Sequence, residues 1–240
     1  MQPLQETMPS FCPFSAFLFL SSASAYTSYI RRKAKRAMGI TCSKNKKFQV
    51  VFILGGPGAG KGTQCEMLSE KLGWAHLSAG DLLRAERKSG SDLAEIINAK
   101  ISAGQIVPSS ITVTLLKNAM ENIYSESGSN QTKFLIDGFP RSAENCSVWE
   151  EKMATSSNLE FVLFLDLSED IMTGRLLERA KTSGRNDDNL EIIRKRFKTF
   201  RDESMPIVDM YEKKGLVKTI VADRSVEDVY EEVQALFKGI

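Results

Sequence analysis

The chain has 240 residues, of which 42% are hydrophobic and 26% are charged, as is ordinary for a globular protein with a buried core. Its net charge of +2 is unevenly distributed, because residues 1–47 hold eight basic residues and one acidic residue, whereas the remainder is acidic. A mildly acidic body argues against nucleic-acid binding by the folded domain. The four cysteines lack metal-site spacing and His76 is the only histidine, which argues against a zinc centre or a histidine-based triad and favours a reducing compartment.

Residues 1–47 are expected to form a basic extension ahead of the folded domain. The apolar stretch at 11–26 is too short and too rich in serine to span a bilayer, which takes about 20 apolar residues. No positive charge precedes it, although secretory signal peptides usually carry one there. A disordered leader, an organellar targeting peptide and an upstream stretch ahead of a true start at Met38 all fit this composition.

A start at Met38 would give the extension a different role. Gly39 would then be exposed, and Ser43 would occupy the motif position for N-myristoylation. Cys42 could carry a second acyl chain, which would matter because one chain alone anchors only marginally. Membrane contact is therefore expected only if this N-terminus is acylated.

From Phe48 onwards, short apolar runs alternate with helix-like segments. Strands are predicted at residues 48–56, 75–77, 133–137, 161–166 and 217–222, and helices at 60–72, 109–124, 169–180 and 188–214, with an exposed loop at 125–132. Strands that alternate with helices indicate βαβ units and a parallel sheet. We therefore predict an α/β fold with a five-stranded parallel sheet flanked by helices, and ligands at the carboxyl ends of the strands.

The first predicted strand runs into a glycine-rich loop, GGPGAGKGT, from Gly55 to Thr63. The loop matches the start of the GxxxxGK[ST] pattern, but Gly62 follows Lys61 and the hydroxyl comes one position later. Glycines let consecutive backbone N–H groups point at phosphate oxygens, and the helix that follows adds partial positive charge at its N-terminus. Lys61 adds a full charge, so the loop predicts a P-loop NTPase that binds nucleotide phosphates.

Together with the loop GPGAGKGTQ, four further motifs resemble the adenylate kinase superfamily of nucleoside monophosphate (NMP) kinases, in which Gly-Thr after the lysine is the usual variant. They are HLSAGDLLR at 76–84, GQIVPS at 104–109, FLIDGFPRSAEN at 134–145, and LERAKTSGRNDDN at 177–189 followed by RKRF at 194–197. The resemblance implies one kinase domain over residues 48–240. Within it we expect a small helical NMP-binding segment at about 78–108 and a short lid at about 181–191.

Within the superfamily, the chain most resembles the UMP-CMP kinase branch. Ala79 stands in SAGD where adenylate kinases usually carry Thr or Ser, and Asn145 follows Arg141 by four residues where they usually carry Gln. An Asn amide offers both a donor and an acceptor to the carbonyl and the N3 or N4 edge of a pyrimidine. The short lid has no cysteine, which excludes a long zinc-bearing lid. The resemblance thus implies UMP and CMP as acceptors, with dCMP left open.

The resemblance also implies ligand contacts at the matching positions. ATP binding is implied for Gly58, Ala59, Gly60, Lys61, Gly62, Thr63, Arg179 and Arg224, the last near the adenine through its backbone. NMP binding is implied for Ser78, Ala79, Arg84, Gln105, Ile106, Val107, Gly138, Phe139, Arg141, Asn145, Arg185 and Arg196. Mg²⁺ is the expected cofactor, near Thr63 and Asp137 through water, because Mg²⁺ in kinase sites keeps waters and has few direct protein ligands.

Charge neutralisation is expected to carry the catalysis. Phosphoryl transfer brings two polyanions together and needs positioning and electrostatic stabilisation more than a protein nucleophile. Planar guanidinium groups suit phosphate oxygens, and the implied catalytic residues are Lys61, Arg141, Arg179, Arg185 and Arg196. Arg84 and Arg141 would grip the α-phosphate of the acceptor, whereas the lid arginines would close over the transferring group.

Other charged residues around the lid are not expected to take part in the chemistry. Arg175, Arg194 and Arg201 are predicted to be solvated. Asp187 and Asp188 are predicted to pair with arginines in the closed lid, rather than to act on the substrate.

The sequence therefore predicts an ATP-dependent kinase of UMP and CMP, acting as a monomer in the cytoplasm or the nucleus. An AMP-specific kinase is one alternative. A second alternative is a membrane-tethered nucleotide-binding module without turnover. The acylation-like string MGITCS motivates this alternative. The complete set of lysine and arginines disfavours that module, because a non-catalytic binder would not need arginines in its lid.

Overall fold

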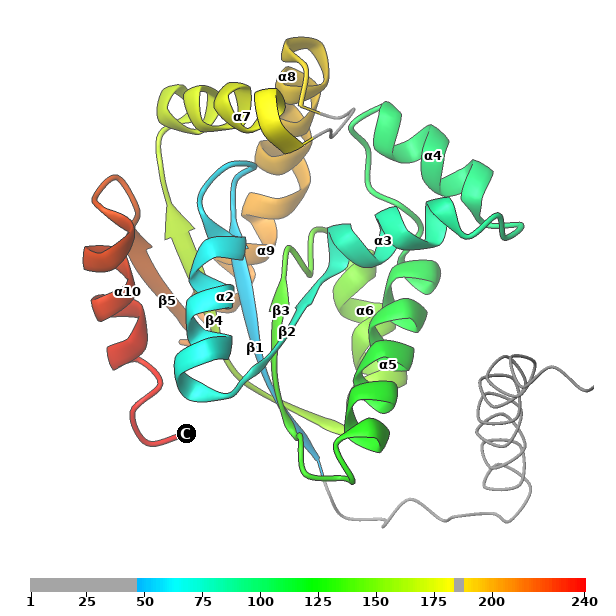
Figure 1. Cartoon of the computed structure of the whole chain (residues 1–240), viewed down its shortest axis with the longest axis vertical. Coiled ribbons are helices and arrows are strands. Elements are labelled where there is room, and N and C mark those ends of the chain that lie inside the picture. Colours follow the sequence, from blue (N-terminus) through cyan, green and yellow to red (C-terminus); the bar gives the residue numbers. More distant parts are fainter. Residues whose placement is uncertain (1–46, 184–187) are drawn as a thin grey trace, which may run out of the picture. The chain divides into compact units, whose positions relative to one another are not determined.

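The computed structural model describes residues 47–183 and 188–240 (Figure 1). The predictions of targeting, acylation and an alternative start, together with those for Arg185 and Asp187, concern residues outside these ranges. Among the described helices, none is both long and apolar enough to cross a membrane.

The centre of the fold is a five-stranded sheet with the order β2-β3-β1-β4-β5, in which every neighbouring pair is parallel. Its strands are β1 (Phe48–Gly55), β2 (Ala75–Ser78), β3 (Lys133–Asp137), β4 (Ser157–Asp166) and β5 (Val217–Val221). The predicted fold class is confirmed. The central place of β1 puts the glycine-rich loop at the carboxyl edge of the sheet, between the ends of β3 and β4, where such folds bind ligands.

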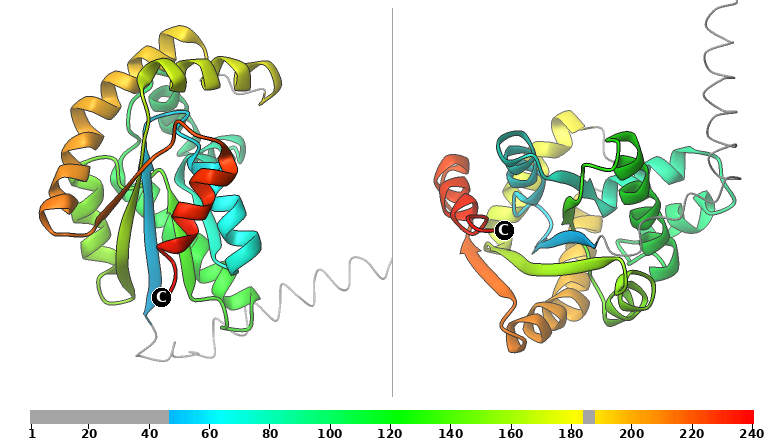
Figure 2. Two further views of the ribbon diagram at one scale, coloured as in Figure 1. Left: turned by 90° about the vertical axis from the view of Figure 1, so that its left-hand side faces the viewer. Right: turned by 90° about the horizontal axis from the view of Figure 1, so that it is seen from below.

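Helices cover both faces of the sheet (Figure 2). Their bounds are α2 (Lys61–Leu72), α3 (Ala79–Lys88), α4 (Ala94–Ser102), α5 (Ser109–Glu126), α6 (Ala143–Met153), α7 (Glu169–Ser183), α8 (Leu190–Thr199), α9 (Met205–Lys213) and α10 (Val226–Ala235), with a π-helical turn η1 (Phe200–Ser204) between α8 and α9. Side chains of α5, α6 and α9 pack on one face, and those of α2, α7, α8 and α10 pack on the other.

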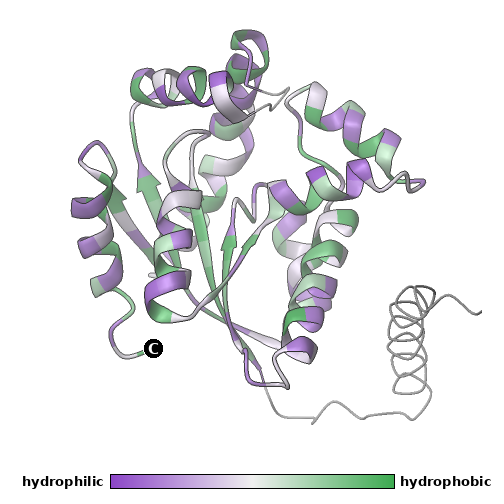
Figure 3. Ribbon diagram, in the orientation of Figure 1, coloured by the Kyte–Doolittle hydropathy of each residue, from purple (hydrophilic) through white to green (hydrophobic). Residues whose placement is uncertain are grey.

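The central strands carry continuous apolar runs because both faces of the sheet are buried there (Figure 3). Along β1, Val50 and Phe52 face one core cluster, whereas Val51 and Ile53 face the other, and all four side chains are fully buried. This double burial explains why continuous apolar runs, rather than alternating patterns, marked the strands in the sequence.

Most of the predicted bounds agree with the structure to within three residues, but two elements differ by more. Strand β4 begins at Ser157, before the predicted start at residue 161. The prediction missed this start because the first residues of the strand are polar, and an irregularity opposite Val50 and Val51 shifts the register there. The helix predicted over 188–214 is α8, η1 and α9 in succession, with Pro206 in the first turn of α9. Proline is tolerated there, because the first helical N–H groups have no partner within the helix.

The segment between β2 and α5 is helical, as predicted, and consists of α3 and α4. It has a small hydrophobic cluster of its own, formed by Leu83, Ile97 and Val107. Ser78 begins α3 by accepting a hydrogen bond on its hydroxyl from the N–H of Asp81 at 3.3 Å. This cap fixes the direction in which α3 leaves the end of β2.

Candidate active site

The glycine-rich loop joins β1 to α2 in a conformation that needs glycine. Gly58 and Gly60 have φ values of 85° and 89°, which L side chains rarely adopt. A Cβ at Gly58 would also stand 2.8 Å from the backbone oxygen of Met172. Glycine at these positions lets the loop turn tightly just ahead of the N-terminus of α2, which is where a phosphate-binding loop lies.

Lys61, the first residue of α2, reaches back across the loop. Its Nζ donates hydrogen bonds to the carbonyl oxygens of Gly55 at 3.0 Å and Gly56 at 2.9 Å. Burial lowers the pKa of Lys61 to about 8, and the nearby charges of Arg141 and Arg196 act in the same direction, whereas Asp137 opposes them. A phosphate placed here would meet an ammonium group that is only weakly hydrated.

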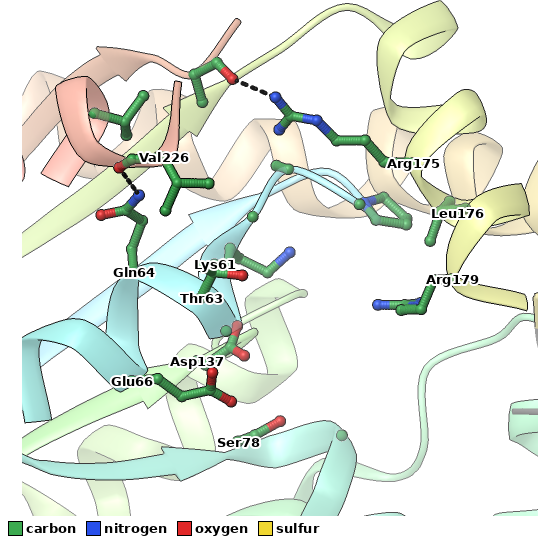
Figure 4. A pocket seen from close by; sticks show the side chains of 18 of the residues that line it. Lys61, Thr63, Gln64, Glu66, Ser78, Asp137, Arg175, Leu176, Arg179 and Val226 are labelled. Atoms are coloured by element: carbon green, nitrogen blue, oxygen red, sulfur yellow. Dashed lines mark hydrogen bonds between the residues drawn. The ribbon is translucent and has the colours of Figure 1, made fainter. Parts of the chain in front are cut away.

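A cavity of about 470 Å³, here called the donor cavity, opens beside the loop (Figure 4). All the described residues for which ATP binding is implied line it, namely Gly58, Ala59, Gly60, Lys61, Gly62, Thr63, Arg179 and Arg224. Lys61 from α2 and Arg179 from α7 point into it from opposite sides. The structure thus brings these residues together, while their roles in binding remain predictions.

The segment after β5 closes one end of the donor cavity. Ala222, Val226 and Val229 line this end, and Gln64 of α2 holds it by donating from Nε2 to the backbone oxygen of Val226 at 3.0 Å. The side chain of Arg224, which also lines the cavity, pairs with Glu232. The backbone contact of Arg224 with adenine stays a prediction.

Arg175 was expected to be solvated, and this expectation is wrong in part. The side chain is exposed, but it lines the donor cavity and donates from a terminal nitrogen to the backbone oxygen of Ala222 at 3.0 Å (Figure 4). Arg175 lies one helical turn before Arg179 on α7, so both side chains face the same side of the helix. That spacing was the signal in the sequence. Arg194 and Arg201 are exposed, as predicted.

A second cavity, of about 80 Å³ and here called the acceptor cavity, lies between the helical segment and the turn after β3. Ala79, Arg84, Gln105, Ile106, Val107, Gly138, Phe139, Arg141, Asn145 and Arg196 line it. Ser78 lines the donor cavity instead. Arg84, Arg141 and Arg196 line both cavities, so three guanidinium groups stand at the boundary between them.

Each of these arginines is held by a neighbour. Nε of Arg141 donates to the carbonyl of Gly138 at 2.6 Å, and the guanidinium of Arg84 pairs with Asp81 at 2.6 Å. Arg196 donates to Asp188 at 3.1 Å. Charge-assisted contacts of this kind fix the direction of a long side chain before a phosphate arrives.

Asp188 connects two of the arginines of the site. Its side chain is fully buried, and Arg179 donates to both carboxylate oxygens, at 2.8 and 2.7 Å, while Arg196 shares one of them. The predicted pairing of Asp188 with arginines is thus confirmed. One carboxylate brings an arginine of α7 and an arginine of α8 together at the cavity wall.

The surroundings of Asp137 suit a magnesium ion held through water. Asp137 ends β3 with its side chain 12% exposed, lines the donor cavity near Thr63, and has Oδ2 3.8 Å from Nε2 of His76. Within the described ranges, no three His, Cys, Asp or Glu side chains form a metal-binding cluster. A single carboxylate and a hydroxyl fit Mg²⁺, which takes its other ligands from waters and substrate phosphates.

Asn145 lies at the wall of the acceptor cavity with 2% of its surface exposed. Ser142 caps helix α6 by accepting from the N–H of Asn145 at 3.2 Å, which places the amide in the first turn. Its Oδ1 accepts from the backbone N–H of Arg141 at 3.0 Å. The residue on which the predicted base preference depends therefore sits inside the cavity wall in a defined orientation.

Comparison with known proteins supports the resemblance of the motifs. A family model described as adenylate kinase matches residues 53–216. The chain is 50% identical to UMP-CMP kinase of Gallus gallus over 78% of this chain and 96% of the relative, and 54% identical to uridylate kinase of Saccharomyces cerevisiae over 77% and 88%. It is 49% identical to UMP-CMP kinase of Homo sapiens over 78% and 96%. With its loop, its parallel sheet and its paired cavities, the chain belongs to the adenylate kinase family.

Proposed function

We propose that this protein transfers the γ-phosphoryl group of ATP to UMP or CMP, giving ADP and the nucleoside diphosphate. One observation carries the proposal: a cavity against the phosphate loop meets a second cavity at a wall of three arginines, Arg84, Arg141 and Arg196. A protein that only bound ATP would need the first cavity alone. The relatives named UMP-CMP kinase and uridylate kinase support pyrimidine nucleotides as acceptors.

In the proposed reaction the loop and Lys61 hold the β- and γ-phosphates of ATP, with the adenine toward Ala222 and Arg224. Arg84 and Arg141 bind the α-phosphate of the acceptor, and Arg179 and Arg196 stabilise the charge that develops on the transferring group. Arg185, outside the described residues, is proposed to join them. Mg²⁺, held through water near Thr63 and Asp137, would neutralise part of the charge of the ATP phosphates.

A coupled assay of ADP formation over AMP, CMP, UMP, dCMP and GMP tests the proposal. We expect the highest kcat/KM with CMP or UMP. A clear preference for AMP would instead identify an adenylate kinase, and absence of turnover with every acceptor would favour the nucleotide-binding module. The same panel decides whether dCMP is an acceptor.

Replacing Asn145 with Gln is expected to shift the preference away from pyrimidines. Asn145 is almost fully buried, so the extra methylene moves the amide relative to both of its internal partners and to the base. We expect the ratio of kcat/KM for CMP over AMP to fall by about tenfold, equivalent to about 1.4 kcal/mol. Steady-state kinetics with the two acceptors measure it, and an unchanged ratio would contradict the role of Asn145.

ATP binding is expected to weaken as the pH rises above about 8. Burial lowers the pKa of Lys61 to about 8 in the free protein, so its ammonium group loses its proton above that value. Bound phosphate favours the charged form, so binding then requires proton uptake, and the dissociation constant should rise by up to about tenfold per pH unit. Calorimetric titration with MgATP between pH 7 and 9.5 measures this slope.

Lys61→Arg is the matched variant for this titration, because a guanidinium group keeps its proton throughout the range. Its affinity for ATP will differ from that of the parent protein, but it should change little between pH 7.5 and 9.5. A flat profile for the unsubstituted protein, or the same slope in both proteins, would show that Lys61 is not the group that titrates.

We further propose that the kinase works as a cytoplasmic monomer. Both cavities are lined by residues of one chain, so no second copy is needed to complete the site. Cys65 and Cys146 are free and buried, as suits a reducing compartment. Light scattering of the purified protein tests the monomer, and mass spectrometry of its native N-terminus tests the acylated start at Gly39.

A further inference from the structure

The amide of Asn145 is held at both ends by other groups of the protein. Its Oδ1 accepts from the backbone N–H of Arg141 at 3.0 Å, and its Nδ2 donates to the hydroxyl of Ser109 at 2.7 Å. Ser109 begins α5, is fully buried, and does not line the acceptor cavity. The amide is therefore pinned between the turn after β3 and the first residue of a different helix.

The two contacts permit only one orientation of the amide. The two ends of an Asn side chain have nearly the same shape but opposite hydrogen-bonding character. A backbone N–H can only donate, so the end that faces Arg141 must be the oxygen, and the hydroxyl of Ser109 then accepts from the nitrogen. The carbonyl of Arg141 is held as well, because the hydroxyl of Ser204 donates to it at 3.1 Å.

With these bonds made, the amide keeps one N–H and one oxygen lone pair for a ligand. Uracil offers an N3–H donor beside a carbonyl, and cytosine offers an N3 acceptor beside an amino group, so either base can satisfy both remaining groups. Adenine presents the same pair of groups as cytosine on a larger ring. Discrimination between them therefore depends on where the amide stands, and not only on its chemistry.

We infer that Ser109 is a positioning residue that sets the base specificity of the acceptor site by holding the Asn145 amide in place. This inference rests on the proposed function, in which Asn145 contacts the pyrimidine. Without the hydroxyl, the nitrogen end of a buried amide loses its partner, and the amide turns or shifts to find another. The groups presented to CMP and UMP then move, whereas the phosphate-binding arginines keep their places.

The test is Ser109→Ala, with kcat and KM measured for CMP, UMP and AMP at saturating MgATP. We expect kcat/KM for both pyrimidine nucleotides to fall by about tenfold, mainly through KM, with kcat and the values for AMP changed less than about twofold. Ser110→Ala is the matched control, because its side chain is exposed on the same turn of α5. It should leave all three acceptors unchanged.

A double-mutant cycle separates positioning from a general structural effect. If Ser109 acts through Asn145, then adding Ser109→Ala to Asn145→Ala should not lower the ratio of CMP to AMP use any further. Independent, additive losses would overturn the inference. If alanine destabilises the fold, Ser109→Cys serves as a second variant, because its side chain has a similar shape but its sulfur is a weaker acceptor. It should shift the ratio of CMP to AMP use in the same direction.

The outcomes also distinguish the two proposals. If the unsubstituted protein prefers AMP, both the proposed function and the role of Ser109 are overturned. If it prefers CMP and UMP, and Ser109→Ala keeps that preference while Asn145→Ala loses it, only the role of Ser109 is overturned.

Discussion

Replacing Arg141 with alanine is expected to lower kcat by at least about 100-fold, because in the proposed reaction Arg141 neutralises charge at the point where the two phosphates meet. Arg141 lines both cavities, and its charge is close enough to Lys61 to lower the pKa of that lysine. Its Nε is anchored on the carbonyl of Gly138 at 2.6 Å, so the guanidinium is already directed before a substrate binds.

Saturating steady-state kinetics with MgATP and CMP measure this loss. Arg194→Ala is the matched control, since Arg194 is exposed on α8 and lines neither cavity. Arg141→Lys should recover only a part of kcat, because an ammonium group keeps the charge but not the planar fork that matches phosphate oxygens. A kcat of Arg141→Ala within about fivefold of the parent value would remove Arg141 from the catalytic set.

The conformation of Gly138 fits the proposed role of Arg141. The φ of Gly138 is 71°, and a Cβ there would stand 2.7 Å from a terminal nitrogen of Arg141. The backbone conformation therefore favours glycine, and a Cβ there would push the guanidinium end of Arg141 out of its present position. Gly138 in the DGFPR motif thus does two things: it allows the turn after β3, and it leaves room for the Arg141 side chain to lie across that turn.

The parallel sheet could be predicted from the sequence because its central strands, β1, β3 and β4, carry apolar runs that are buried on both faces. The start of β4 could not be predicted, because Ser157 and Asn158 are polar. These two residues join the sheet through backbone pairing with β1, which the sequence pattern does not reveal. The π-helical turn at Phe200–Ser204 was missed for a similar reason. Periodicity marks a helix, but it does not report which carbonyl each N–H selects.

In the site, the motifs predicted which residues would meet, because each motif ties a residue to the end of a strand or the start of a helix. What they could not supply is the set of contacts between motifs. Ser109 and Asn145 are 36 residues apart, and nothing in either string indicates that one hydroxyl holds the other amide. The place of Arg175 in the cavity wall was missed for another reason. Its helical spacing from Arg179 is visible in the sequence, but its hydrogen bond to the backbone oxygen of Ala222 is not.

The second large effect is expected at Asp188, where one buried carboxylate holds Arg179 and Arg196. Asp188→Asn keeps the shape but removes the negative charge between two guanidinium groups, so the arginines repel each other with less compensation. We expect kcat to fall by about 10- to 100-fold, since both arginines line the cavity in which the proposed transfer takes place.

The same substitution should lower the free energy of unfolding. Breaking a buried ion pair costs about 3–5 kcal/mol, but Arg179 and Arg196 are 33% and 20% exposed, so solvent reduces this to about 2 kcal/mol. For a domain of this size that corresponds to a fall in Tm of about 4–8 °C. Calorimetry and steady-state kinetics on the same preparation measure both effects.

Asp202→Asn is the control, because Asp202 is exposed and pairs with Lys198 at 3.6 Å on the surface of the same helical run. Its kcat and Tm should stay close to the parent values, since exposed pairs contribute little. If Asp188→Asn lowered Tm but left kcat unchanged, Asp188 would hold α7 and α8 together without directing their arginines. A loss of kcat that persists well below the Tm of the variant is the result that assigns it to positioning Arg179 and Arg196 for transfer.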